Sequence, residues 1–356
     1  MLCTYEFAGP VPEPSREGVV LALGADQAVP PRVTRARTQN KSNVVGVVAL
    51  FCAASMLGSQ FVGPRYHHLF GVDINKDYGR SFSLNNGDAP LLPLDILELS
   101  VEEFMKLLEQ HAHSEMMHCL FLITLDCSRA SKANRRATAK EKRDFYVPAI
   151  EKMKLFIEAA RLHYNIFLLW EFVNDKYVLK LIKEEFPEMK SWTCDGHCYE
   201  SRRRVFFVSG FDPDMKMFKE ELKLAIEREG GGKKYCAAEA FEKFGIKIPR
   251  GTRMFGAWSK EEYRRDPTKG TDPWEKRAPT ICRGGIWLVF PSGREVRVPV
   301  KILRWIRTCG GDVEFKFSPG DGETLRRLIL AMGVSTVVGS AARRALDRWI
   351  EEYGLP

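Results

Sequence analysis

One cysteine of this chain stands where its thiol is placed for chemistry. Residues 121–125 (FLITL) form an apolar run typical of a buried strand, and the run ends at Asp126-Cys127. The residues that follow, 128–143, include seven Lys or Arg and one acid. Cationic surroundings favour the thiolate, which is the nucleophilic form of cysteine. The pattern predicts a nucleophile beside a basic loop, although a lone cysteine is more often a small buried hydrophobe and the loop could equally hold phosphates.

Acidic residues end other predicted strands and indicate a nucleoside site. Asp73 and Asp95 end apolar segments, and a turn of small residues, 51–60 (FCAASMLGSQ), follows the first strand. Such a turn lets the backbone approach a ligand, and a carboxylate on the next strand accepts hydrogen bonds from ribose hydroxyls. Asp95 is suited to accept from an adenine amino group. A single acid at a strand end more often caps a helix, but the ordered set favours the ligand interpretation.

Strands and helices alternate along the chain in lengths that suit an α/β fold. Helices with a 3.6-residue apolar period are predicted near 100–111 and at 146–163. Strands are predicted at 44–51, 69–74, 118–125, 165–172 and 204–210. The alternation predicts a doubly wound, mostly parallel Rossmann-like sheet, in which ligands lie at the carboxyl ends of the strands. Cys127 and Glu171 therefore lie at the ends of strands that we expect to be neighbours.

The chain divides by composition into an arm and two domains. Residues 1–43 are rich in Pro, Gly and Arg and show no apolar period, so we expect a flexible N-terminal arm. Residues 44–210, completed by 318–356, form the predicted cofactor-binding catalytic domain. The regular alternation stops in 211–317, where we expect a smaller, irregular domain that includes a hairpin at 285–300.

The composition is that of a globular protein with a modest preference for anionic partners. The chain has 356 residues, of which 45% are hydrophobic, and a formal net charge of +8. No apolar run reaches the length of a membrane span and no secretory signal is evident, so we expect an intracellular protein, in the cytoplasm or nucleus, whose nine cysteines are thiols. Cys194, His197 and Cys198 lack a second ligand pair at zinc spacing, so we expect no metal. Because no run is long enough to span a membrane, we also expect no membrane contact.

Taken in order, these pieces resemble the cytosine-C5 methyltransferases, which transfer a methyl group from S-adenosylmethionine to carbon 5 of cytosine. The resemblance rests on the order and spacing of these motifs rather than on any one of them. Asp73 and Asp95 stand where that family has its ribose and adenine acids. Residues 51–60 are similar to its Phe-x-Gly-x-Gly turn, DCSRAS (126–131) to Pro-Cys-Gln-x-x-Ser, WEFV (170–173) to Glu-Asn-Val, ESRRRV (200–205) to Gln-x-Arg-x-Arg, and VGSA (338–341) to Gly-Asn-x-Val.

The resemblance implies a role for each of these residues. Cys127 is the nucleophile that adds to C6 of cytosine, Glu171 holds the N3/N4 edge of the base, and Arg204, with Arg202, binds its O2 side or a flanking phosphate. These groups cannot reach C6 in a stacked duplex, so the base must be flipped out. The implied cofactor contacts are Phe51, Ala53, Ser55, Asp73, Ile74, Asp95, Ile96 and Ser340, and the implied contacts to nucleic acid are Arg129, Ser131, Lys132, Arg135 and Arg136.

The chain departs from the family pattern at several motif positions. Ala53 and Ser55 replace the two glycines of the first turn, and both are small enough for close approach provided that neither needs a positive φ. Asp126 replaces the proline beside the nucleophile, and its carboxylate disfavours the thiolate unless the basic loop offsets it. Ser128, Glu200 and Ser340 replace the usual Gln, Gln and Asn.

The function that these observations favour is S-adenosylmethionine-dependent methylation of cytosine C5 in double-stranded DNA, with 211–317 as the target-recognition domain. One alternative is the same chemistry on RNA, although the chain lacks the Cys-Phe-Thr tripeptide associated with the tRNA-directed branch. A second alternative is a catalytically impaired nucleic-acid-binding or regulatory protein on the same fold. A third is a pocket that accepts a modified cofactor or transfers a group other than methyl.

Overall fold

The computed structural model describes residues 44–114, 116–126, 130, 137–194, 199–200, 202–230, 236–256, 266–282, 284–309 and 311–355. All the described residues belong to one compact unit. The predicted N-terminal arm, 1–43, therefore lies outside the described residues.

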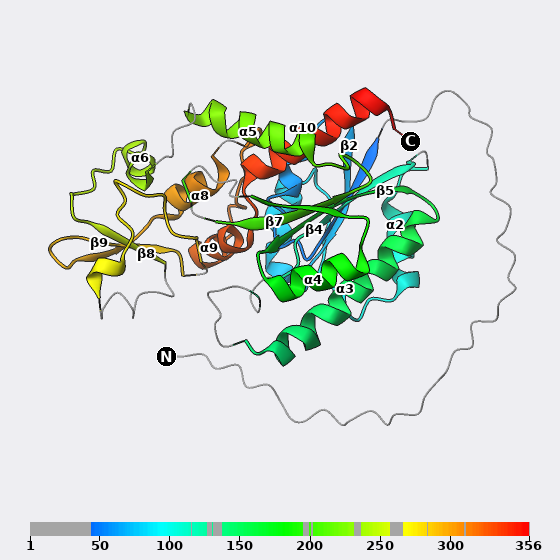
Figure 1. Cartoon of the computed structure of the whole chain (residues 1–356), viewed down its shortest axis with the longest axis horizontal. Helices are drawn as coiled ribbons and strands as arrows, with labels where there is room; N and C mark the ends of the chain where they lie inside the picture. The colour runs from blue at the N-terminus through cyan, green and yellow to red at the C-terminus, as the bar shows by residue number, and fades with distance from the viewer. Residues whose placement is uncertain are drawn as a thin grey trace, which may run out of the picture. The chain divides into compact units, whose positions relative to one another are not determined.

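Seven strands within the described residues form one sheet in the order β3-β2-β1-β4-β5-β7-β6 (Figure 1). The pairs β1–β2, β2–β3, β1–β4 and β4–β5 are parallel, whereas β7 runs antiparallel to both β5 and β6. The prediction of a doubly wound, mostly parallel sheet is confirmed. The strands are β1 (Val45–Leu50), β2 (Tyr66–Val72), β3 (Leu91–Leu92), β4 (His118–Ile123), β5 (Asn165–Val173), β6 (Lys190–Cys194) and β7 (Arg204–Ser209).

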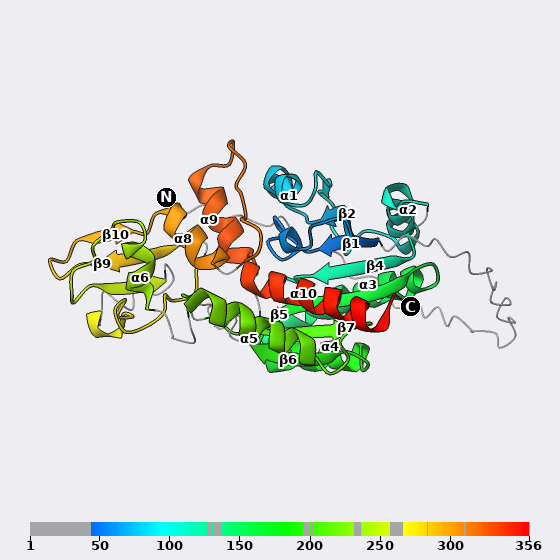
Figure 2. The same cartoon turned by 90° about the horizontal axis from the view of Figure 1, so that it is seen from above.

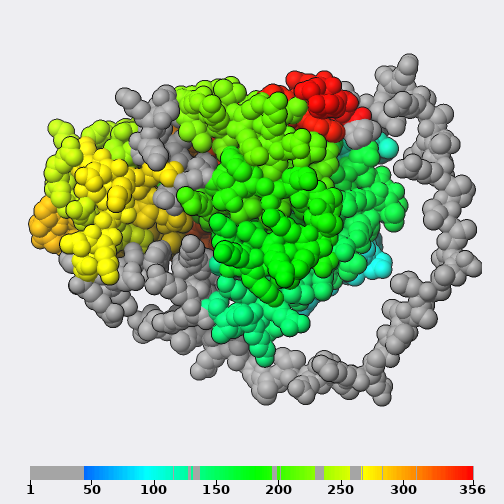
Figure 3. Space-filling model, viewed as in Figure 1, coloured from blue at the N-terminus to red at the C-terminus, as the bar shows by residue number. Residues whose placement is uncertain are grey.

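The central strands are apolar along their whole length because both faces of the sheet are covered. Every residue of β1 and β4 is buried. Helices α2 (Val101–His111), α3 (Ala139–Arg161) and α4 (Lys176–Glu185) cover one face, as Figures 1 and 2 show. In the space-filling view from the same direction, the green segments of the chain face the viewer and hide the blue strand β1 (Figure 3).

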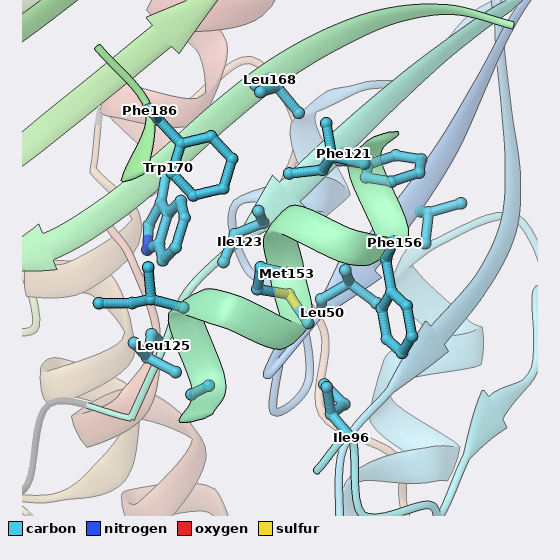
Figure 4. Close-up of a cluster of buried hydrophobic side chains, with 14 of the residues drawn as sticks. Leu50, Ile96, Phe121, Ile123, Leu125, Met153, Phe156, Leu168, Trp170 and Phe186 are labelled. Carbon is cyan, nitrogen blue, oxygen red and sulfur yellow. The ribbon is translucent and has the colours of Figure 1, made fainter. Parts of the chain in front are cut away.

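Aromatic rings fill the core between these helices and the sheet. Phe104 of α2 and Phe156 of α3 stack with their ring centroids 4.2 Å apart. Trp170 of β5 meets Phe186, which follows α4, edge to face, and Met153 lies in the same cluster (Figure 4). The packing of Trp170 therefore holds the carboxyl half of β5 in place. This half of the strand also carries Glu171.

Helices α1 (Gly79–Asn85), α5 (Lys216–Gly230) and α10 (Thr336–Tyr353) cover the opposite face. Val337, Ala341 and Ala345 of α10 share a core with Val45 and Leu120 of the sheet. Ion pairs also join α10 to its neighbours. They are Arg343 with Asp312 at 2.7 Å, Arg344 with Glu221 at 3.1 Å, and Arg348 with Glu221 at 3.0 Å.

The stretch 211–317, predicted as a separate domain, begins on the large sheet. Phe211, Met215, Phe218 and Leu222 lie in the core with β7 and α10, because α5 packs along α10. The part that leaves the large sheet therefore starts after α5. No single described helix is long and apolar enough to cross a membrane. Helices α9 (Glu323–Met332) and α10 pass that test only as a pair, with a bend of 47° between them.

A second sheet of three antiparallel strands forms in the order β10-β9-β8. The predicted hairpin at 285–300 corresponds to β9 and β10. Its core includes Leu288 and Ile302, together with Met56 and Tyr78 from segments beside the large sheet. The remaining elements are β8 (Arg253–Gly256), β9 (Ile286–Val289), β10 (Glu295–Arg297), α6 (Ala237–Glu242), α8 (Val300–Thr308), α9 (Glu323–Met332), η1 (Gly58–Gln60), η2 (Lys76–Tyr78) and η4 (Pro267–Lys269).

Candidate active site

A cavity of about 670 Å³ lies at the carboxyl ends of β1, β2 and β4. Sheet order reverses between β2 and β4 around β1, and such a switch point is where open α/β sheets bind ligands. Segments from both sheets contribute to the wall. The lining residues are Phe51, Asp73, Ile74, Asn75, Tyr78, Leu94, Asp95, Ile96, Leu97, Asp126, Phe145, Arg202, Arg204, Thr280, Ile281, Cys282, Leu328, Ala331 and Met332.

Asp73 occupies one end of the cavity, just after β2. Its carboxylate accepts hydrogen bonds from the backbone N–H of Ala53, at 2.8 Å, and of Asn75, at 3.0 Å. Burial raises the pKa of Asp73, and the charge of Asp126 raises it further against the opposing effect of the two N–H donors. The side chain of Ile74 beside it is 70% exposed and offers an apolar surface at the rim.

The turn after β1 is held in an unusual backbone conformation. Phe51, Ala53 and Ser55 have φ values of 52°, 47° and 46°, in the left-handed region that favours glycine. A left-handed residue with a side chain costs roughly 1–2 kcal/mol. The sequence predicts close approach at Ala53 and Ser55 on the condition that neither needs a positive φ. That condition is not met, because both residues have a positive φ. The turn keeps the glycine conformation without the glycines.

Asp95 and Ile96 lie beside this turn and extend the same end of the cavity. Asp95 accepts a hydrogen bond from the N–H of Leu97 at 2.9 Å, which leaves its second carboxylate oxygen for another partner. Ile96 is 2% exposed and forms part of the apolar floor. Phe51, Asp73, Ile74, Asp95 and Ile96 are thus brought together in one cavity.

At the other end Arg204 lines the cavity and forms an ion pair with Glu171, which is not itself a lining residue. The distance from Nε of Arg204 to Oε1 of Glu171 is 2.7 Å, and their side chains are only 12% and 6% exposed. Arg202 lies two residues away and donates a hydrogen bond to the carbonyl of Ala331 at 3.0 Å. Burial, with the nearby charges of Arg204 and Arg307, lowers the pKa of Arg202 to about 9, so it remains protonated at neutral pH.

Tyr146 of α3 fixes the segment that leaves β4. Its hydroxyl donates to the carbonyl of Asp126 at 2.9 Å and accepts from the N–H of Ala130 at 3.0 Å. These two contacts lie on either side of Cys127, which is itself outside the described residues. Arg129, Ser131, Lys132, Arg135 and Arg136 are also outside them. Asp126 lines the cavity between the Asp73 end and the Glu171–Arg204 pair.

No protein-family model and no curated protein matches this sequence. Solved structures match it over most of its length. A Dnmt2 methyltransferase of S. pombe is 10% identical with a TM-score of 0.60, covering 87% of this chain and 100% of that one. The methyltransferase EhMeth of Entamoeba histolytica is 12% identical with a TM-score of 0.55, covering 86% and 98%. A prophage-encoded E. coli chain, named as a DNA modification methyltransferase, is 12% identical with a TM-score of 0.53, covering 86% and 99%.

The protein has the Rossmann-like fold of these methyltransferases. With that fold in view, three of the predicted cofactor contacts stand apart from the rest. Ser340 of α10 is fully buried, donates to Oε1 of Gln60 at 2.7 Å and accepts from the N–H of Asp312 at 2.7 Å. The side chains of Ser340, Ala53 and Ser55 do not line the cavity. Direct cofactor contact by these three residues stays a prediction.

Other lining residues escaped the motif comparison with the methyltransferases. Phe145 comes from the helix that carries Tyr146, and Leu328, Ala331 and Met332 come from the end of α9. Thr280, Ile281 and Cys282 follow a segment rich in Pro and charged residues, where no apolar period locates them. Of these residues, only Phe145 could have been placed near the site from the sequence, because it directly precedes the predicted helix at 146–163.

The described residues contain no group of three or more His, Cys, Asp or Glu side chains placed to hold a metal ion. Cys194 of β6 is buried. His197 and Cys198, its possible partners in the sequence, lie outside the described residues.

Proposed function

We propose that this protein transfers a methyl group from S-adenosylmethionine to carbon 5 of cytosine in DNA. The supporting observation is that one cavity is lined by a nucleoside-type turn, by Asp126, the neighbour of Cys127, and by Arg204, whose buried partner is Glu171. A nucleoside site alone is common in α/β proteins. Glu171 is not in the lining itself but lies directly behind Arg204, in a small neighbouring pocket that Arg202 and Arg204 also line. A glutamate beside an arginine matches the chemistry of a cytosine ring.

The cavity fits S-adenosylmethionine in volume, in apolar surface and in charge. Its volume of about 670 Å³ is in the range of sites that enclose small ligands. Phe51 and the exposed Ile74 supply apolar surface for an adenine ring, and Asp73 supplies a carboxylate for ribose hydroxyls. When bound, the cofactor supplies a methyl group made electrophilic by a positively charged sulfur. The carboxylates of Asp73, Asp95 and Asp126 favour a ligand that carries positive charge.

The chain's own residues supply the remaining chemistry. In the proposed reaction the Cys127 thiolate adds to C6, which breaks the aromaticity of the ring and makes C5 nucleophilic. Glu171 then stabilises a proton at N3, and Arg204 both orients that carboxylate and faces the O2 side of the base. Their low exposure keeps water from competing for these hydrogen bonds.

A nucleic-acid partner is supported by where the positive charge is located. Residues 236–327 contain 19 Lys and Arg against 12 Asp and Glu, a net charge of +7 out of +8 for the chain. In the β9–β10 hairpin, Arg297 lies over Trp287 at 5.7 Å and Arg294 over Phe290 at 4.9 Å. Clustered cations beside half-exposed aromatic rings are typical of surfaces that bind phosphates and bases.

The deciding experiment uses S-adenosylmethionine labelled in its methyl group. The protein is incubated with duplex DNA or with RNA, the nucleic acid is digested, and the labelled base is identified. We expect label in 5-methylcytosine from DNA, and label from RNA alone would shift the proposal to the RNA alternative. DNA with 5-fluorocytosine at the target is expected to trap a covalent complex, since fluorine cannot leave C5 as a proton does.

Cysteine variants assign the nucleophile. Cys127→Ser should abolish both turnover and trapping while DNA binding stays close to wild type. Cys236→Ser is the matched control, because Cys236 is partly exposed beside α6 and does not line the cavity. Protein that binds cofactor and DNA yet gives neither label nor trapped complex would support the impaired-enzyme alternative instead.

A further inference from the structure

A buried ion pair stands behind the cavity wall, at the position of a family motif. Glu200 and Arg307 are both 0% exposed, and Nη2 of Arg307 lies 3.0 Å from Oε1 of Glu200. Glu200 occupies the place where the methyltransferases usually have a neutral Gln. Arg307 lies in α8, 107 residues later in the chain. The extra negative charge of Glu200 therefore has a positive partner supplied by a distant element.

The pair contacts three separate segments at once. Oε1 of Glu200 also accepts from the N–H of Ile281 at 2.8 Å. Nη1 of Arg307 donates to the carbonyl of Gly333 at 3.1 Å, and the hydroxyl of Ser335 donates to the carbonyl of Arg307 at 3.3 Å. The segments around Glu200, Ile281 and Gly333 are thus joined by one buried ion pair.

The same three segments build the side of the cavity away from Asp73. We call this side the far wall, and it consists of Arg202, Arg204, Thr280, Ile281, Cys282, Ala331 and Met332. The hydrogen bond from Arg202 to Ala331 joins two of the segments directly. The third is held through Ile281, whose N–H bonds to Glu200.

We infer that Arg307 and Glu200 act as positioning residues, whose buried pair sets the placement of the far wall and so of the two arginines that face the cavity. Neither side chain lines the cavity, so each acts through the segments it holds. The choice of a charged pair supports this role over a simply stabilising one. Apolar side chains of similar volume are commonly as stabilising as a buried ion pair, but they do not fix direction.

The test separates position from stability with three variants. Arg307→Met and Glu200→Gln each leave one buried charge or polar group without its partner, and each should lower the melting temperature by roughly 5 °C. The double variant E200Q/R307M buries no unpaired charge, and its melting temperature should return most of the way to that of wild type. The amide introduced by Glu200→Gln still offers an oxygen to the N–H of Ile281, so the packing there changes little.

Cys282 reports on the far wall itself, without any dependence on methyl transfer. Its half-buried thiol lines the cavity and donates to the carbonyl of Thr280 at 3.4 Å. Alkylation of Cys282 by iodoacetamide is followed by mass spectrometry of its peptide, well below the melting temperature. We expect both single variants to react roughly threefold faster than wild type or more, and the double variant to stay fast although its stability has recovered.

Arg304→Met is the matched control, one turn earlier on α8. Arg304 pairs with Glu314 at 3.0 Å on the surface, where the side chains are 34% and 62% exposed. Its loss should leave both the melting temperature and the Cys282 rate unchanged. A double variant that melts like wild type and also alkylates at the wild-type rate would overturn the inference, because the pair would then serve stability alone.

Arg307→Lys keeps the test decisive if the methionine variants do not fold. Lysine retains the charge opposite Glu200 but cannot also reach the carbonyl of Gly333, so folding should survive while the wall loosens. A raised Cys282 rate in this variant supports the positioning role. A wild-type rate contradicts it.

Discussion

The two ends of the cavity deal differently with departures from the methyltransferase motifs. At the Asp73 end, Ala53 and Ser55 stand where glycine is usual, and both still adopt a positive φ. At the far wall, Glu200 stands where Gln is usual, and Arg307 supplies a counter-charge at 3.0 Å. The Ala53 and Ser55 substitutions leave strain in the backbone, whereas the charge of Glu200 is balanced by that of Arg307.

The difference follows from the size of the two costs. A left-handed Ala or Ser costs roughly 1–2 kcal/mol, which a folded domain can absorb. A single carboxylate buried without a partner costs several kcal/mol, which is a large part of a domain's stability. Departures in charge therefore need a compensating residue, and departures in backbone preference do not.

The largest effect is expected from breaking the Glu171–Arg204 pair. Glu171→Gln removes the carboxylate that we propose holds the base edge, so labelled-methyl transfer should fall by about 100-fold or more. Arg204 is left with its charge largely buried, so the free energy of unfolding should fall by about 3 kcal/mol in a denaturant titration.

The control for that variant is a pair of similar geometry on the surface. Lys154 and Glu185 lie 3.0 Å apart with side chains 38% and 37% exposed. Glu185→Gln should change stability by less than about 1 kcal/mol and leave turnover intact. If Glu171→Gln and Glu185→Gln lowered the free energy of unfolding equally, burial of the Glu171–Arg204 pair would not make it more important for stability than a surface pair.

A smaller loss is expected at the other end of the cavity. Asp73→Asn keeps the shape of the side chain and an oxygen for the N–H of Ala53 but loses the anionic acceptor. Affinity for S-adenosylmethionine, measured by calorimetry, should fall by about 10- to 100-fold. Asp77→Asn, at an exposed acid of η2 outside the lining, should bind like wild type. Undiminished binding by Asp73→Asn would remove Asp73 from the proposed site.

Restoring glycine tests whether the strain in the turn is real. Ala53→Gly should raise the free energy of unfolding by about 1 kcal/mol, because glycine adopts φ near 47° without a steric penalty. Ser55→Gly should gain less, since the Ser55 hydroxyl accepts from the N–H of Gly58 at 3.2 Å. Ala54→Gly, at the buried residue between them with no positive φ, should instead lose about 1 kcal/mol. The same sign in all three would argue against strain.

The smallest effect is a pH dependence that belongs to the Asp73 end. The raised pKa of Asp73 means that its carboxyl takes up a proton at a higher pH than the usual value of 3.8. Cofactor affinity should therefore decline as pH falls, beginning above that value, because the neutral carboxyl is a weaker acceptor. Above the raised pKa the buried charge also costs some folding stability. Both effects should vanish in Asp73→Asn, and a decline of equal size in that variant would assign the titration elsewhere.

The strands that position most of the site could be predicted from the sequence. The continuous apolar runs of β1, β4 and β5 are typical of a sheet covered on both faces, and they locate Asp126 and Glu171 at carboxyl ends. The acids after β2 and near β3 follow from the same reasoning. Lys190–Cys194, the strand β6, has no apolar run or clean alternation, so its pattern did not reveal it.

What the sequence could not show depends on contacts between distant residues or on backbone angles. Nothing near Arg307 marks it as the partner of Glu200, since the two are 107 residues apart. The hydroxyl of Tyr146 contacts the backbone of Asp126 and Ala130, and the helical period of the sequence does not indicate these contacts. Ala and Ser normally avoid positive φ, so their residue types pointed away from the conformation that Ala53 and Ser55 adopt.

The packing of α10 on the sheet has a consequence for how the chain acquires its structure during synthesis. Residues of β1 and β4 share a core with Val337, Ala341 and Ala345, which are synthesised much later. One face of the sheet must stay uncovered until those residues have left the ribosome. The large sheet therefore completes its folding only after α10 has been translated, and nascent chains that stop before α10 should expose this apolar face and recruit chaperones.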